Sequence, residues 1–106
     1  MEKKSRVVAR VGAWIGITMQ DATEFAAALG VEKGVLVGDI SRAGPAAGGG
    51  LKAGDVIVKA DGHEVASPSE FKTFLTQKDV GQVLTLDVVR DGKPIKVEVK
   101  PREWPN

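Results

Sequence analysis

The residues with the clearest chemical meaning are a glycine between two isoleucines, Ile15, Gly16 and Ile17, which Trp14 precedes. From Ile17 to Met19, apolar and polar residues alternate with the period of a strand that has one buried face. A glycine at the start of such a strand indicates a tight turn or the close approach of another group. We hypothesise that this group is the terminal carboxylate of a peptide; the alternative is an ordinary β-bulge.

Motifs of the common catalytic families are missing from the sequence, which has no Gly-x-Ser-x-Gly, His-Glu-x-x-His or Gly-x-x-x-x-Gly-Lys. The single histidine, His63, follows an Asp-Gly pair that is typical of a turn. Ser41 and Ser69 have no candidate base nearby in the sequence, and Ser67 is better explained as a helix cap. We therefore expect a non-catalytic domain that holds no cofactor and no metal.

Composition sets the limits of the domain. At 106 residues, with 42% hydrophobic and 27% charged, the chain has room for one ordinary globular domain. Its 15 Lys and Arg residues nearly balance 14 Asp and Glu, so charge gives no reason to expect nucleic acid or a membrane surface as a partner.

The sequence contains no cysteine, so cysteine usage does not indicate the cellular compartment. No apolar run reaches the ~18 residues of a membrane span, and the polar start lacks the apolar region of a signal peptide. The sequence therefore predicts either a cytosolic protein or a piece of a longer secreted or anchored chain.

Helices are predicted in three places. The first covers residues 23–29, and the second begins at Pro45 and ends within about a turn because three glycines follow. The third and longest has a capping box in which Ser67 caps the helix, Pro68 takes its first position and Glu70 completes the box. In this helix the i, i+3, i+4, i+7 spacing makes a stripe that is apolar except at its last member, formed by Phe71, Phe74, Leu75 and Lys78.

Strands are predicted between these helices, over residues 17–19, 35–40, 56–58, 83–89 and 95–99. The Asp91-Gly92 pair favours a tight hairpin turn between the last two. Together the elements predict an α+β domain whose small, mostly antiparallel sheet forms a partly open barrel or sandwich.

Several of these motifs together resemble those of bacterial PDZ domains. They are Trp14-Ile15-Gly16-Ile17, Gly34-Val-Leu-Val37, the block from Gly44-Pro45-Ala46-Ala47 to Gly50-Leu51-Lys-Ala-Gly54-Asp55-Val56-Ile57, Asp61-Gly62 and Arg90-Asp91-Gly92-Lys93. The chain looks most like the PDZ domains that follow the protease domain in HtrA/Deg-type serine proteases. This resemblance implies two helices plus a short helical insert, and the permuted strand order of bacterial PDZ domains. It divides the chain into an arm or linker (1–10), a PDZ domain (11–101) and a tail (102–106).

The resemblance also implies a binding site. The backbone N–H groups of Ile15, Gly16 and Ile17 are expected to converge on a peptide carboxylate. The strand that follows would accept the peptide as an added strand, and the long helix would form the opposite wall. Arg10 is a candidate charge partner of the carboxylate. The expected strand and pocket residues are Trp14, Ile17, Thr18, Met19, Phe71, Phe74 and Leu75, where helical spacing favours core positions for Phe71 and Leu75 and leaves Phe74 open between core and groove.

The implied function is a module that captures C-terminal or exposed apolar segments of substrate proteins for an attached serine protease in the periplasm or another extracytoplasmic space. Its expected partners are protein C-termini with an apolar last residue, and not nucleic acid or a membrane. One alternative is an assembly module that docks on a neighbouring domain or subunit. Another is the PDZ domain of a membrane metalloprotease or of a carboxyl-terminal processing protease.

Overall fold

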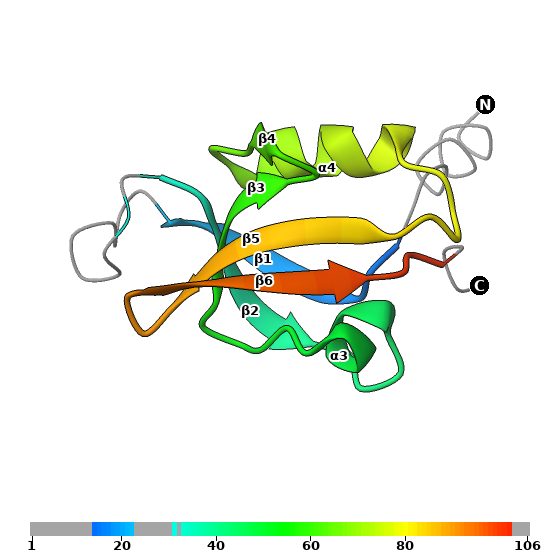
Figure 1. The fold of residues 1–106 in the computed structure, drawn as a ribbon, viewed down its shortest axis with the longest axis horizontal. Helices are drawn as coiled ribbons and strands as arrows, with labels where there is room; N and C mark the ends of the chain where they lie inside the picture. The colour runs from blue at the N-terminus through cyan, green and yellow to red at the C-terminus, as the bar shows by residue number, and fades with distance from the viewer. Residues whose placement is uncertain (1–13, 23–30, 32, 103–106) are drawn as a thin grey trace, which may run out of the picture.

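The computed structural model describes residues 14–22, 31 and 33–102. Within them the chain forms six strands and two helices, shown in Figure 1. In chain order these are β1 (Ile17–Asp21), β2 (Val35–Ile40), α3 (Pro45–Gly49), β3 (Val56–Ala60), β4 (His63–Glu64), α4 (Pro68–Gln77), β5 (Leu84–Arg90) and β6 (Lys93–Val99). The helix predicted over residues 23–29 lies outside the described residues.

The six strands form one antiparallel sheet in the order β1-β2-β3-β5-β6, with β4 paired to β3. Among the described strands, β1 pairs only with β2, and β6 pairs only with β5. The sheet is therefore open, with β1 and β6 at its two edges. The predicted α+β class and the small antiparallel sheet are confirmed.

Two tight turns shape the hairpins of the sheet. Asp61 and Asp91 have positive φ angles of 50° and 52°, and the glycines that follow, Gly62 and Gly92, have φ angles of 84° and 77°. Two successive residues with positive φ make the turn whose twist matches that of paired strands. Both turns were predicted from their Asp-Gly pairs, but the short strand β4 after the first was not.

Capping residues set the ends of the two described helices. In α3, Pro45 takes the first position, and Gly50 ends the helix with a φ of 94°. In α4, the Ser67 hydroxyl accepts a hydrogen bond from the Glu70 N–H at 3.3 Å, as predicted. The capping box is modified, because the Glu70 carboxylate accepts from the N–H of Ala66 at 3.5 Å.

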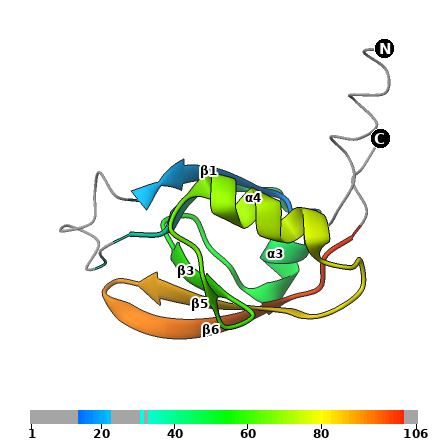
Figure 2. The same ribbon diagram turned by 90° about the horizontal axis from the view of Figure 1, so that it is seen from above.

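A single core lies between the sheet and the helices. Its largest fully buried members include Phe71 from α4, Ile15 before β1, Ile57 from β3 and Leu84 and Leu86 from β5. Figure 2 shows α4 running alongside β1, and α3 lies against β6. Neither described helix has the length and apolar character needed to cross a bilayer.

Candidate functional site

The stretch before β1 is held by four backbone hydrogen bonds: the Trp14 N–H donates to the Arg102 carbonyl at 2.9 Å, and three other bonds end on carbonyl groups of the stretch. The Trp14 carbonyl accepts from the N–H of Arg102 at 3.1 Å. The Ile15 carbonyl accepts from Ala46 at 2.9 Å, and the Gly16 carbonyl accepts from Ser41 at 2.9 Å. We call residues 14–17 the carboxylate loop, after the ligand we hypothesise for it.

These bonds fix the direction of the amides in the carboxylate loop. In a trans peptide, the N–H of each residue points opposite to the C=O of the residue before it, and the described residues contain no cis peptide bond. Because each of these carbonyls faces its donor, the N–H of the next residue (Ile15, Gly16 or Ile17) points away from that donor. Within the described part of the chain, the amides of Ile15 and Gly16 have no backbone acceptor. Neighbouring backbone amides without a protein acceptor can bind an anion.

Gly16 is the conformational centre of the loop. Its φ of 81° lies in the left-handed region, which is costly for residues with a side chain. A Cβ at this position would lie 3.1 Å from the Gly44 Cα, 3.2 Å from Trp14 Cζ2 and 3.3 Å from the Ser41 Cβ. Both the turn and the close approach of neighbouring backbone therefore require a glycine here.

β1 continues from the loop as an edge strand. Ile17 and Met19 are partly buried against the core, whereas Thr18 between them is exposed. The register shifts between Ile17 and Met19, and the Thr18 hydroxyl accepts a hydrogen bond from the N–H of Asp39 at 2.7 Å. This irregularity lies on the side of β1 that pairs with β2. On its other side, next to α4, β1 pairs with no strand of the described sheet.

The three candidate pocket residues on α4 lie in two different environments. Phe71 is 0% exposed and Leu75 is 8% exposed, and both belong to the core. Phe74 is partly buried, and its ring lies 6.2 Å from that of His63 at an interplanar angle of 48°. Phe74 therefore packs towards β4.

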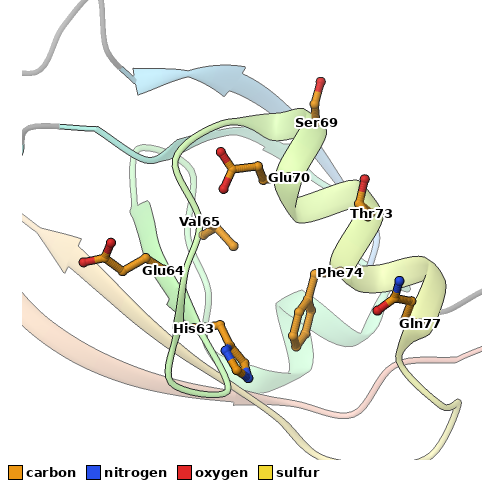
Figure 3. A pocket seen from close by; sticks show the side chains of 8 residues that line it. All are labelled: His63, Glu64, Val65, Ser69, Glu70, Thr73, Phe74 and Gln77. Atoms are coloured by element: carbon orange, nitrogen blue, oxygen red, sulfur yellow. The ribbon is translucent and has the colours of Figure 1, made fainter.

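Phe74 lines a groove of about 380 Å³ on the flank of α4 that faces the β3–β4 hairpin. Figure 3 shows that side chains of α4 and of β4 line the two sides, with Phe74 and His63 next to each other. In the same view α4 separates this groove from β1.

Helical geometry identifies the α4 residues that face β1. With 3.6 residues per turn, the helix turns Phe71 and Leu75 to the core and Thr73 and Gln77 to the groove beside β4. The remaining flank carries Lys72 and Thr76. Sequence reasoning missed both residues because they lie outside the apolar stripe, and the spacing of four between them is the signal that places them on one side.

A further residue that sequence reasoning missed is Arg102. Besides pairing with Trp14 through its backbone, its guanidinium lies 5.7 Å from the centroid of the Trp14 ring and donates to the Ala43 carbonyl. The distance along the chain between Trp14 and Arg102 hid this contact. Arg10, the predicted charge partner, lies outside the described residues.

The site as described holds backbone donors and apolar side chains. Across residues 14–22, 31 and 33–102, no group of three or more His, Cys, Asp or Glu side chains is arranged to hold a metal ion. What these residues offer to a ligand is a set of backbone N–H donors beside an open strand edge.

Comparison with known proteins gives the family. The PDZ domain family model matches residues 13–100. A probable periplasmic serine endoprotease DegP-like of Halomonas elongata is 36% identical over 96 residues, which cover 88% of this chain and 20% of that protein. The protein of the same name from Pseudomonas fluorescens is 36% identical over 89 residues, covering 81% of this chain and 19% of its own length. The chain thus spans about a fifth of these relatives.

Solved structures agree with the sequence relatives. The HtrA-type protease AlgW with a decapeptide superposes with a TM-score of 0.78 at 28% identity, over 91% of this chain and 30% of that one. The HtrA3 PDZ domain bound to a phage-derived ligand, FGRWV, gives a TM-score of 0.74 at 25% identity, over 85% of both chains. In DegP-like serine proteases the PDZ domain is a non-catalytic module, and this chain, which is similar to proteins of the HtrA/DegP type, belongs to the PDZ domain family.

Proposed function

We propose that this domain binds the C-terminus of a peptide or unfolded protein by strand addition. The peptide lies between β1 and α4, its terminal carboxylate accepts hydrogen bonds from the N–H groups of Ile15, Gly16 and Ile17, and its backbone pairs with the free edge of β1. The observation that carries the proposal is that the amides of Ile15 and Gly16, at the entry to the edge strand β1, have no backbone acceptor among the described residues.

The last side chain of the ligand is proposed to be apolar. Ile17 and Met19 are only partly buried on β1, and Leu75 keeps 8% of its surface exposed on α4, so together they offer an apolar floor. The adaptable Met19 favours tolerance among apolar residues. The ligand FGRWV of the HtrA3 PDZ domain, which ends in valine, supports this assignment.

The parent protein is proposed to be a periplasmic HtrA/DegP-type serine protease that uses this domain to capture or sense substrate. The support comes from the relatives, which are named periplasmic serine endoproteases. Within that parent we propose residues 11–101 as the PDZ domain, preceded by an arm over 1–10 and followed by a tail over 102–106.

The proposal is tested by titrating the chain with a valine-ended pentapeptide in two forms, with a free C-terminal carboxylate and with an amide in its place. Filling the apolar pocket contributes about 1.5–3 kcal/mol. Adding charge-assisted hydrogen bonds and subtracting ordering costs gives roughly micromolar affinity for the free carboxylate.

The amidated peptide is expected to bind at least about tenfold more weakly, because hydrogen bonds to a charged acceptor contribute more than those to a neutral one. Fluorescence anisotropy of labelled peptides measures both affinities. Equal affinity for the two forms would disprove carboxylate capture and favour strand pairing alone, as in an assembly module.

A further inference from the structure

A second cavity lies at the end of the molecule where three separate segments meet. Its volume is about 430 Å³, and its walls come from the turn before α3 (43–45), the loop after α4 (80–81) and the chain that follows β6 (100–102). We call it the end groove. It is distinct from the open edge of β1, since no residue of β1 or of α4 lines it.

The end groove combines apolar walls with positive charge. Pro45 and Val80 supply apolar surface, and Lys100 and Arg102 supply two cations, whereas the lining includes no Asp or Glu. Neither cation forms an ion pair with another described residue. A partner of complementary charge would therefore be acidic.

One wall of this groove carries an exposed apolar side chain. Val80, which lines the groove, is 46% exposed. An apolar side chain of a partner could cover this surface. The partner therefore needs an apolar side chain as well as negative charge.

The groove shares a wall with the carboxylate loop. Arg102 pairs with Trp14 through its backbone, and its guanidinium is held by the Ala43 carbonyl and the Trp14 ring. Gly44, also in the lining, has its Cα 3.1 Å from the position that a Cβ added at Gly16 would take. A guanidinium that is already held loses less side-chain entropy when it binds an anion.

We propose that the end groove binds an acidic peptide segment from a partner protein, with one apolar side chain inserted beside Val80 and carboxylates facing Lys100 and Arg102. A peptide is a better match than an anionic membrane for two reasons. The surface is concave, and two cations fall short of the basic cluster of about 4–8 Lys or Arg that marks lipid recognition. This binding is independent of a terminal carboxylate.

The test uses the 106-residue chain and a peptide whose two ends are uncharged. Such a peptide offers the carboxylate loop no terminal carboxylate to bind. The probe is N-acetylated and C-amidated, with one leucine among aspartates and glutamates. Amide chemical shifts followed during NMR titration are expected to change at Val80, Gly81 and Arg102. Shifts confined to β1 would overturn the proposal.

Variants separate the groove from general charge effects. Lys100→Glu is expected to weaken binding of the probe about tenfold, because it replaces an attraction by a repulsion. Lys93→Glu makes the same charge change in the β5–β6 hairpin, outside the groove lining, and is expected to leave the affinity within about twofold. Equal loss in both variants would overturn the assignment of the groove.

Two further measurements complete the test. A probe with serine in place of leucine is expected to bind several-fold more weakly, since the apolar anchor is lost; unchanged affinity would remove the role of Val80. Binding of the chain to phosphatidylglycerol vesicles that competes with the probe would replace the peptide proposal by a lipid one. The titration with a valine-ended peptide reports on β1 alone, so either site can fail while the other stands.

Discussion

At the scale of single residues, Gly16 has both a conformational role and a binding role in the proposed site. Its φ of 81° and the 3.1 Å between an added Cβ and the Gly44 Cα disfavour a side chain, while its N–H lies between those of Ile15 and Ile17 in the proposed anion site. The sequence suggested only that something comes close to this glycine. The structure adds that part of what comes close is the protein's own backbone.

Gly16→Ala is predicted to cost roughly 1–2 kcal/mol of stability, because an L-residue is forced into the left-handed region, and to abolish binding of the valine-ended peptide. Gly62→Ala is the matched control, since Gly62 has a similar φ of 84° but nothing within 4 Å of its Cβ position. It should lose comparable stability and keep its peptide affinity. Urea denaturation and peptide titration measure the two effects, and retained affinity in Gly16→Ala would contradict the proposed amide site.

At the scale of elements, a buried ion pair joins β5 to the turn that leads into β3. Asp55 is 1% exposed and accepts from Arg90 Nε and Nη2, both at 2.7 Å. Arg90 Nη2 also donates to the Gly50 carbonyl at 2.9 Å, at the end of α3. The hydrogen bond with Asp55 raises the pKa of Arg90. Arg90 thus contacts the end of α3, the helix whose Ala46 amide donates to the Ile15 carbonyl.

Arg90→Met is predicted to destabilise the domain by about 3–5 kcal/mol, because it leaves the Asp55 carboxylate buried without its partner. Lys96→Met removes the cation of the Lys96–Asp87 ion pair, in which the Lys96 side chain is 76% exposed. This change is expected to lower the free energy of unfolding by at most about 1 kcal/mol. Thermal and urea unfolding followed by circular dichroism compare the two. Similar losses for both variants would show that burial of Asp55 is not the deciding factor.

At the scale of the whole molecule, Asp61 links three parts of the fold. Its carboxylate accepts from Lys78 Nζ at 2.6 Å, at the end of α4, and from the Thr85 N–H at 2.9 Å, in β5. Burial acts to raise the pKa of Asp61, but the hydrogen bonds from Lys78 and Thr85 outweigh it and the pKa is lowered. The ionised form is therefore favoured by folding.

A lowered pKa in the folded state means that Asp61 stabilises the domain above the pKa of an unfolded aspartate, about 3.9. This stabilisation is lost as the pH falls through the lower pKa of the folded state. Unfolding free energies measured from pH 7 to pH 2 are predicted to fall less steeply below about pH 4 in Asp61→Asn than in the parent chain. Asparagine keeps the shape and tolerates the φ of 50°, so identical pH profiles would rule out this role.

The sequence by itself determined most of the elements. Local signals are sufficient for them: an N-cap at Ser67, glycines with positive φ after aspartates, and alternation along strands act between residues that are close in the chain. The resemblance of several motifs, from Trp14-Ile15-Gly16-Ile17 to Arg90-Asp91-Gly92-Lys93, then indicated the family to which the chain belongs.

Only the tertiary structure decided how the carboxylate loop is oriented and which flank of α4 faces β1. The donors that turn the loop's carbonyls inward are Ser41, Ala46 and Arg102, which lie far along the chain from residues 14–16. Hydrophobic periodicity shows which face of α4 is buried, but not which neighbour covers each flank. The position of the β3–β4 hairpin settles this, because it places Phe74 against His63 and leaves the opposite flank of α4 to β1.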